Sequence, residues 1–318
     1  MKKLAVVGAT GLVGQKVLEV LKEESLSDSF ELYMFVSDRS AGKVMVYNDR
    51  HYLLMELDEQ ILDIGFGYAI FLTSETISKV WVPKFARAGA IVIDNSSAFR
   101  MKKNIPLIVP EINFNLIKNQ DKIIANPNCS TIQLVLVLDR LKNLSKIKRV
   151  VVSSYQSVSG AGKDALKDLN DKSNDFFIMG ITDNIIPQIG EIDDGGNCAE
   201  ENKIINETKK ILGIDSEVYA TTVRVPTSFC HGESVFIEFE SNIDIKEVKK
   251  ALNVRYIKQG DMFYLTDCTQ TNLTYVCRIR QSSNKIIQLF IIADNLRRGA
   301  SYNAVEILRL IDNRKNAD

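Results

Sequence analysis

Cys129 is the residue of this sequence best placed to act as a nucleophile. A short apolar run before it predicts a buried strand, which Pro127 ends. The apolar run after it predicts a helix that Asn128 or Ser130 can cap. A thiol at a helix start lies beside unpaired N–H groups and the positive end of the helix dipole, which lower its pKa and favour the thiolate. The alternative is a small buried hydrophobic residue, the usual state of a free cysteine.

Arg224 and His231 flank a turn between two predicted strands, residues 219–225 and 234–240. We therefore expect them at the same end of two neighbouring strands. A histidine titrates near neutrality and can shuttle a proton for thiolate chemistry. Taken singly, His231 would be structural, but beside a helix-start cysteine and a carboxylate-binding arginine it is the best candidate base. Cys230 is a weaker nucleophile candidate, because no helix follows it.

Gln156 and a charged helix further along the chain are candidates for holding a polar ligand. Gln156 follows a predicted strand, and the glycines after it allow a ligand to approach closely. The predicted helix over residues 200–212 places Glu200, Lys203 and Glu207 on one face. A solvated charged face is the alternative for this helix, and for Glu207 it is the interpretation that we adopt.

The beginning of the chain predicts a nucleotide-binding turn. An apolar strand, residues 4–7, leads into glycines with the spacing GxxGxxG, and a helical pattern follows. Such glycines let the backbone approach a pyrophosphate, which the helix N-terminus holds through its N–H groups and dipole. A plain tight turn is the alternative, and the flanking strand and helix favour the dinucleotide site. The turn comprises Gly8, Ala9, Thr10, Gly11, Leu12, Val13 and Gly14.

The end of the second predicted strand, residues 30–36, bears on the choice of nucleotide. An acidic residue there accepts hydrogen bonds from the ribose of NAD, whereas an arginine with hydroxyl neighbours binds the 2′-phosphate of NADP. Both types are present, as Asp38 and Arg39. Arg39, flanked by Ser37 and Ser40 and close to Lys43, favours NADP, while a solvated polar turn is the alternative.

Continuous apolar runs predict the sheet that positions these residues. Residues 68–72 and 90–93 are such runs, typical of parallel strands buried on both faces, and the helix 77–88 between them completes a βαβ unit. Ligands of open α/β sheets gather beyond the carboxyl ends of the strands. Arg100 falls in that zone and could bind an anion, although a surface ion pair is the commoner role. A helix over residues 300–312 is expected to pack back on this first domain.

The composition excludes several classes of protein. The 318 residues suffice for about two domains with real cores, and 45% hydrophobic with 25% charged residues is typical of a globular protein. A formal net charge of zero argues against nucleic-acid or membrane-surface binding, and no apolar run is long enough to span a bilayer. Five cysteines without metal-ligand spacing predict no metal site and a reduced, cytoplasmic compartment.

Together these motifs resemble the aspartate-semialdehyde dehydrogenase family. The element Asn128-Cys129-Ser130-Thr131 and the spacing of Arg224 and His231 are specific to it, whereas the glycine turn is not. The stretches that carry the resemblance, in the family's order, are residues 8–14, 39–43, 109–111, 126–131, 155–162, 223–226 with His231, and 294–296. The chain departs from the family at Thr73-Ser74-Glu75, where a carboxylate would weaken NADP binding. It also has Cys277 in place of a glycine. Its region 170–198 is shorter than in the family, which affects the placement of Glu200 and Lys203.

The resemblance implies roles for individual residues. Cys129 would be the nucleophile, His231 the acid/base, and Gln156 the residue that orients the substrate. The implied substrate contacts are Arg224 to the α-carboxylate, Glu200 to the amino group, and Arg100 and Lys203 to phosphate, with Asn128 nearby. The implied cofactor contacts are Thr10, Gly11, Leu12, Val13, Arg39, Ser40, Ser159, Gly160 and Asn295.

The resemblance also implies an α/β fold with a Rossmann-like NADP-binding domain, residues 1–128 completed by the helix 297–318, and an α+β catalytic and dimerisation domain, residues 129–296. The implied reaction interconverts L-aspartate 4-semialdehyde plus inorganic phosphate with L-aspartyl 4-phosphate through a Cys129 thioester, in lysine, threonine and methionine biosynthesis. A homodimer or homotetramer is expected. The alternatives are an N-acetylglutamyl-phosphate reductase, whose substrate carries no charged nitrogen for Glu200, and a non-catalytic nucleotide-binding paralogue, which would be expected to lose the thiol or the imidazole.

Overall fold

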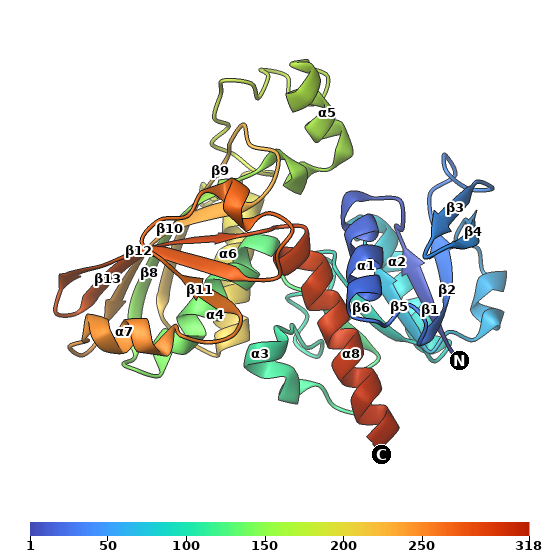
Figure 1. Cartoon of the computed structure of the whole chain (residues 1–318), viewed down its shortest axis with the longest axis horizontal. Helices are drawn as coiled ribbons and strands as arrows, with labels where there is room; N and C mark the ends of the chain where they lie inside the picture. Colours follow the sequence, from blue (N-terminus) through green and yellow to red (C-terminus); the bar gives the residue numbers. More distant parts are fainter. Residues whose placement is uncertain (318) are drawn as a thin grey trace. The chain divides into compact units, whose positions relative to one another are not determined.

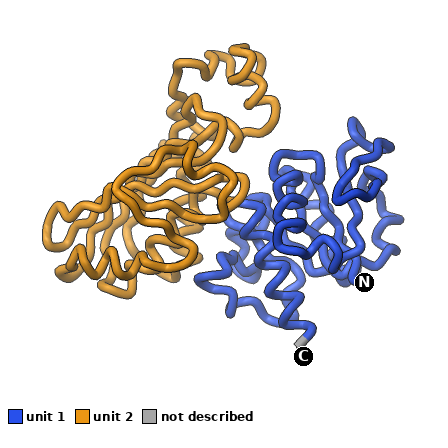
Figure 2. Tube along the Cα trace, viewed as in Figure 1, with its two compact units in different colours: residues 1–127, 300–318 blue, residues 128–299 orange. Residues whose placement is uncertain are grey.

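The computed structural model describes residues 1–317. The chain folds as two compact units (Figure 2). Unit 1 consists of residues 1–127 and the segment from Ala300 onward, and unit 2 consists of residues 128–299. Each unit has its own sheet.

Unit 1 is built on a seven-stranded sheet in the order β3-β4-β2-β1-β5-β6-β7. Neighbouring strands are parallel except β3 and β4, which form an antiparallel hairpin at one edge. Every residue of β5 and β6 is buried, so the parallel strands predicted from the runs 68–72 and 90–93 are confirmed. The strands are β1 (Lys2–Val7), β2 (Phe30–Phe35), β3 (Val44–Tyr47), β4 (Arg50–Met55), β5 (Tyr68–Phe71), β6 (Ile91–Asp94) and β7 (Ile123–Ala125).

Helices cover both faces of this sheet because successive side chains of a strand point to opposite sides. Leu4 and Val6 of β1 share a core with α1 and the terminal helix α8, which lie side by side in Figure 1. Ala5 and Val7 share a second core with α2 on the other face. The prediction that the terminal helix packs back on the first domain is therefore confirmed. The helices of unit 1 are α1 (Leu12–Glu23), α2 (Glu75–Arg87), α3 (Pro110–Asn113) and α8 (Tyr302–Ala317).

Unit 2 is built on a six-stranded sheet in the order β11-β12-β13-β10-β8-β9. Helix α4 lies against one face of it, and its residues from Ser130 to Leu138 are all buried. The opposite face leaves Val151, Tyr155 and Tyr219 exposed. The strands are β8 (Ile147–Gln156), β9 (Glu217–Arg224), β10 (His231–Phe239), β11 (Ile257–Gln259), β12 (Thr274–Ser283) and β13 (Ile286–Ala293); the helices are α4 (Cys129–Lys142), α5 (Lys163–Asp171), α6 (Ala199–Leu212) and α7 (Ile245–Ala251).

The strand order corrects one prediction. The strands expected as neighbours, β9 and β10, are separated by β8, which is parallel to β9 and antiparallel to β10. The chain crosses from β8 to β9 through helices, as a parallel pair requires, and β9 therefore becomes an edge strand. Strand β10 then pairs with the free side of β8. The carboxyl end of β8 thus lies between the ends of the two strands that carry Arg224 and His231.

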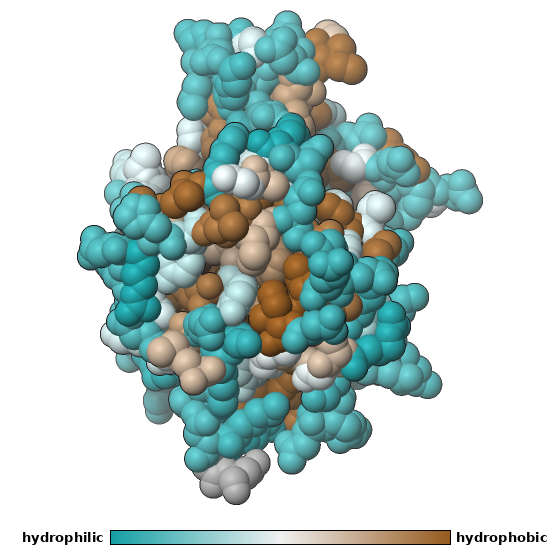
Figure 3. Space-filling view, turned by 90° about the vertical axis from the view of Figure 1, so that its right-hand side faces the viewer, coloured by the Kyte–Doolittle hydropathy of each residue, from teal (hydrophilic) through white to brown (hydrophobic). Residues whose placement is uncertain are grey.

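One face of the molecule is shown in Figure 3. Charged and polar residues cover most of the face shown in Figure 3, with hydrophobic residues in small groups among them. None of the helices within residues 1–317 combines the length and apolarity that crossing a bilayer requires.

Candidate active site

Cys129 is the first residue of helix α4, as predicted. Asn128 caps this helix, because its Oδ1 accepts hydrogen bonds from the backbone N–H groups of Ser130 (2.9 Å) and Thr131 (3.3 Å). Cys129 is partly exposed, whereas the other four cysteines are buried. Gly299 packs against it so closely that a Cβ there would lie 2.8 Å from the Cβ of Cys129. A reachable thiol therefore stands at a capped helix start.

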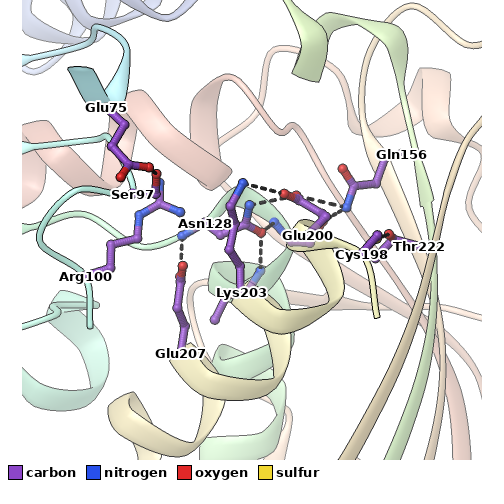
Figure 4. Close-up of polar contacts among 12 residues, drawn as sticks. Glu75, Ser97, Arg100, Asn128, Gln156, Cys198, Glu200, Lys203, Glu207 and Thr222 are labelled. Atoms are coloured by element: carbon purple, nitrogen blue, oxygen red, sulfur yellow. Dashed lines mark hydrogen bonds and ion pairs between the residues drawn. The ribbon is translucent and has the colours of Figure 1, made fainter. Parts of the chain in front are cut away.

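A buried carboxylate, Glu200, lies next to this helix cap (Figure 4). Its Oε1 accepts hydrogen bonds from Asn128 Nδ2 (2.7 Å) and Gln156 Nε2 (3.2 Å), and its Oε2 pairs with Lys203 Nζ (3.0 Å). Burial by itself would raise the pKa of Glu200, but the charge of Lys203 and these hydrogen bonds outweigh burial and lower it to about 2. Glu200 is therefore ionised at neutral pH, and the structure brings four predicted site residues together.

Glu207 corrects the expectation of a solvated face. It is buried on helix α6, and its Oε2 accepts the backbone N–H of Asn128 at 2.7 Å (Figure 4). Helix α6 packs beside α4, so the face that carries Glu200 and Glu207 is turned toward the cap instead of toward solvent. Sequence periodicity identified the shared face but not what covers it.

Arg224 lies beside Gln156 at the edge of the sheet, because the two residues are paired in the register of β8 and β9. Its Nη1 donates to the backbone carbonyl of Ser157 at 2.8 Å. Burial lowers the pKa of the guanidinium, while the nearby charges of Glu200 and Cys129 oppose this shift. The thiol, the guanidinium and the carboxylate are thus close enough to interact electrostatically.

His231 is fully buried at the start of β10. Its Nδ1 accepts the backbone N–H of Ser157 at 3.0 Å, and its Nε2 has no hydrogen-bond partner within residues 1–317. Burial, reinforced by the charge of Arg224, lowers the pKa of His231 to about 3, so the ring is neutral at neutral pH. A Cβ at Gly160 would lie 2.8 Å from Nη1 of Arg224 and 3.3 Å from Nε2 of His231, so this glycine leaves room beside both groups.

Ser159 and Asn295, the residues implied as cofactor contacts, are buried and bond to each other. Asn295 Oδ1 also accepts from the Ser157 hydroxyl and from the backbone N–H of Cys230. These contacts connect the segments on either side of His231. Sequence reasoning did not identify Ser157 as a functional residue, because its backbone N–H and its hydroxyl meet His231 and Asn295 only in the folded chain. It also did not identify Ser130, whose hydroxyl accepts from Gln156 Nε2 at 3.0 Å.

The glycine turn of unit 1 is tightly built. Gly8 has a positive φ of 90°, and a Cβ there would lie 2.5 Å from the carbonyl oxygen of Leu72. A Cβ at Gly14 would lie 2.2 Å from the carbonyl oxygen of Gly8. Helix α1 starts after Gly11, which has no side chain to cap the first N–H groups. This turn therefore fits a pyrophosphate, with Thr10, Leu12 and Val13 alongside.

The residues after β2 lie at the surface. Ser37, Asp38 and Arg39 are exposed, and Ser40 is half-buried. Asp38 Oδ1 accepts the backbone N–H of Arg39 at 2.8 Å. The carboxylate is therefore engaged with its own turn.

Two further residues of unit 1 have defined partners. Arg100 is buried, so the alternative role in an ion pair at the surface does not apply. Its Nε donates to the backbone carbonyl of Asn126 (2.9 Å), and its Nη2 donates to that of Asn95 (2.7 Å). Glu75 pairs with Lys79 and accepts from the Ser97 hydroxyl (Figure 4). Within residues 1–317, no group of three or more His, Cys, Asp and Glu side chains is arranged to hold a metal ion.

Most of the chain matches two protein-family models. Residues 3–120 match the family model "Semialdehyde dehydrogenase, NAD binding domain", and residues 138–298 match "Semialdehyde dehydrogenase, dimerisation domain". The fold and the site thus define a two-domain oxidoreductase of the NAD(P)-dependent semialdehyde dehydrogenase class.

The particular family follows from full-length relatives. The chain is 38% identical to the aspartate-semialdehyde dehydrogenase of Aquifex aeolicus, with 97% of each protein covered, and 40% identical to that of Campylobacter jejuni, with 96% covered. The crystal structure of aspartate semialdehyde dehydrogenase II from Vibrio cholerae complexed with ASA superposes with a TM-score of 0.91 at 35% identity, covering 98% of each chain. The chain belongs to the aspartate-semialdehyde dehydrogenase family.

Proposed function

We propose that this enzyme interconverts L-aspartate 4-semialdehyde plus inorganic phosphate with L-aspartyl 4-phosphate, using NADP and a thioester on Cys129. The observation that carries the proposal is the grouping of a partly exposed helix-start thiol with Arg224, ionised Glu200 and neutral His231 in one unit. The thioester divides one difficult step into two easier ones. Biosynthesis of lysine, threonine and methionine uses the reductive direction.

The protein residues act on the carbonyl group in sequence. In the oxidative direction the Cys129 thiolate adds to the aldehyde carbon, and Gln156 orients the adduct. NADP⁺, when bound, would accept the hydride that leaves this adduct. Phosphate, bound by Arg100 and Lys203 with Asn128 nearby, then attacks the thioester carbon. The thiolate leaves, so Cys129 returns to its starting state.

Charge complementarity supports aspartate semialdehyde as the substrate. Arg224 suits a planar carboxylate, because its guanidinium can bond both oxygens at once. Glu200 is buried and ionised, with a pKa of about 2, so it suits the ammonium group of an amino acid. The acylated nitrogen of N-acetylglutamyl phosphate carries no charge and would leave Glu200 without this partner. A non-catalytic role is less well supported, because the chain keeps both Cys129 and His231.

NADP is favoured over NAD by the turn after β2. Arg39 is exposed between Ser37 and Ser40, while the Asp38 carboxylate accepts the N–H of Arg39. Arg39 and the nearby Lys43 supply the positive charge that a 2′-phosphate needs, while the Asp38 carboxylate is bonded to the backbone of its own turn. Glu75, the departure from the family, is partly neutralised by Lys79. The other proposed cofactor contacts are Gly8, Thr10, Gly11, Leu12, Val13, Gly14, Ser159, Gly160 and Asn295.

We also propose a cytoplasmic homodimer or homotetramer that assembles through unit 2. The exposed apolar side chains Val151, Tyr155 and Tyr219 on the open face of its sheet support an interface there. The five free cysteines suit a reducing compartment.

The test is phosphate-dependent reduction of NADP⁺ by the purified protein, with L-aspartate 4-semialdehyde and N-acetylglutamate semialdehyde assayed in parallel. We expect turnover with the first aldehyde only, and none without phosphate. Cys129→Ala should lose turnover and still bind NADP⁺. Turnover with the acetylated aldehyde alone, or near-normal turnover of Cys129→Ala, would overturn the proposal.

A further inference from the structure

Glu233 carries a buried carboxyl group that the proposed reaction does not use. It is fully buried on β10, and neither of its oxygens has a hydrogen-bond partner among residues 1–317. Both polar atoms of the Gln133 amide, also fully buried, lack a partner within the same residues. Buried polar groups in folded proteins nearly always bond to protein or to ordered water. These two side chains therefore require an explanation.

The two side chains lie close to each other, between helix α4 and the sheet of unit 2. Burial raises the pKa of Glu233 well above its usual range, and the nearby amide of Gln133 opposes that shift. The carboxyl group is therefore neutral at neutral pH, so it can donate as well as accept. Gln133 follows Cys129 by one helical turn on the same face of α4. The pair thus lies beneath the start of the nucleophile helix.

A chain of hydroxyl groups leads from this place to Gln156. Ser154 is paired with Glu233 in the register of β8 and β10, so their Cβ atoms lie roughly 4.5–5.5 Å apart on the same face of the sheet. Ser154 Oγ lies 3.4 Å from Ser130 Oγ, which accepts from Gln156 Nε2 at 3.0 Å. All these side chains are buried. Glu233 therefore lies at the inner end of a polar chain that begins at Gln156.

Glu200 fixes the direction of these hydrogen bonds. It is ionised and can only accept, so the Gln156 amide turns its nitrogen toward it (Figure 4). The same nitrogen donates to Ser130, whose own hydroxyl proton can then be donated to Ser154. The Ser154 proton in turn needs an acceptor further in. Glu233 offers oxygens there, although no direct bond joins the two side chains in the described structure.

We propose that Glu233, Gln133 and Ser154 bind an internal water molecule beneath the start of α4, and that Glu233 acts through this water as a positioning residue for Gln156. Water suits the place because the three groups offer donors as well as acceptors, and a buried water makes about three hydrogen bonds. It joins the two unpaired side chains to the hydroxyl chain. The effect on turnover rests on the proposed function, in which Gln156 orients the substrate, whereas the water site does not.

The water site can be tested without substrate. A crystal structure that resolves ordered solvent should show one water bonded to Glu233, Gln133 and Ser154. The infrared difference spectrum between the wild type and Glu233→Gln should show a protonated carboxyl stretch at neutral pH, and this band should move in Ser154→Ala. Ser153→Ala, on the opposite face of β8, is the control and should leave the band in place. A direct hydrogen bond between Glu233 and Gln133 without water, or an ionised carboxylate at neutral pH, would overturn the site.

Turnover tests the positioning role. Leucine fills the place of Glu233 without polar atoms, so Glu233→Leu should lower kcat about tenfold or more, as misplacement of an orienting group does. Glutamine keeps a donor and an acceptor, so Glu233→Gln should retain most of the kcat that the leucine variant loses. Ser154→Ala interrupts the same chain, so adding it to Glu233→Leu should cause little further loss. Additive losses, or equal losses in the leucine and glutamine variants, would contradict the positioning role.

Alkylation of Cys129 separates positioning of Gln156 from damage to helix α4. The other four cysteines are buried, so iodoacetamide reports on Cys129. We expect an unchanged alkylation rate in Glu233→Leu and in Ser154→Ala, because the proposed effect acts on Gln156 and not on the thiol. A changed rate in Ser154→Ala, the milder variant that serves if Glu233→Leu does not fold, would overturn the role. Neither the spectrum nor the alkylation uses the aldehyde, so failure of the proposed function would not mimic these results.

Discussion

The side-chain amide of Asn128 donates to Oε1 of Glu200 at 2.7 Å, while its carbonyl oxygen caps helix α4. One side chain therefore holds both the start of the nucleophile helix and the carboxylate proposed to bind the substrate ammonium.

Substitutions at Asn128 should separate these two roles. Serine is also a good N-cap but cannot reproduce the donor to Glu200. We expect Asn128→Ala to be less stable than Asn128→Ser by about 1 kcal/mol in urea unfolding. Both variants should show a raised KM for the aldehyde. Equal stability of the two variants would contradict the capping role.

Glu200 should make stability depend on acid pH. Its folded-state pKa of about 2 lies below its ordinary value of 4.5, so the stabilisation is present above pH 4.5 and is lost as the pH falls toward 2. The shift corresponds to roughly 3 kcal/mol. Glu200→Gln should therefore lose less stability than the wild type between pH 4.5 and 3, and its kcat/KM should fall by about 10- to 100-fold. Parallel acid unfolding curves would contradict this.

Glu233 should have the opposite effect. It is fully buried on β10, and this burial holds its pKa well above 4.5. Its carboxyl oxygens have no hydrogen-bond partner within residues 1–317. Gln133 on α4 is a nearby polar side chain. A raised pKa means that stability is greatest below pH 4.5 and falls as the pH rises. Glu233→Gln resembles the protonated form, so its free energy of unfolding should fall less steeply than that of the wild type between pH 4.5 and about pH 9.

A matched control lies on the same strand. Glu238 is hydrogen-bonded by Lys148, which lowers its pKa, so Glu238→Gln should not flatten the alkaline side of the stability profile. If Glu238→Gln and Glu233→Gln changed that profile alike, a buried neutral carboxyl at position 233 would be the wrong explanation.

Gly160→Ala should impair turnover without unfolding the protein. The added methyl group would lie 2.8 Å from Arg224 Nη1 and 3.3 Å from His231 Nε2, so both groups must shift. Displacements of this size in a site lower rates by up to about 10²-fold. We expect kcat/KM to fall at least about tenfold with little change in Tm. Gly67→Ala, whose nearest neighbour would be at 3.7 Å, is the control and should leave kinetics unchanged.

Arg39→Ala should change the nucleotide preference. Loss of a charge-assisted bond to the 2′-phosphate should weaken NADP⁺ binding by about 10- to 100-fold and leave NAD⁺ binding nearly unchanged. Titration with each nucleotide measures both values. An equal loss of affinity for both nucleotides would mean that Arg39 contacts a part of the cofactor that NAD and NADP have in common.

Much of unit 1 could be predicted from the sequence alone, because its signals are local. Apolar runs such as residues 68–72 form strands that are buried on both faces. The first strand, the glycine turn and the first helix follow one another within one short stretch of sequence, so their order can be predicted directly. The start of α4 at Cys129 also follows from neighbouring residues, since Asn128 caps it. The edge hairpin β3 and β4 has no comparable run, as its residues are mostly exposed or half-buried, and it was not predicted.

Only the tertiary structure decided how the site is assembled. The position of β8 between β9 and β10 depends on long-range pairing, and it is what sets Gln156 beside Arg224. The burial of Glu207 depends on α6 packing against α4, which a periodic charge pattern does not reveal. The hydrogen bond to His231 Nδ1 comes from a backbone N–H 74 residues away in the chain. Sequence patterns specify residue types and local elements, whereas hydrogen-bond partners and pKa values arise from burial and from neighbours that only the folded chain brings together.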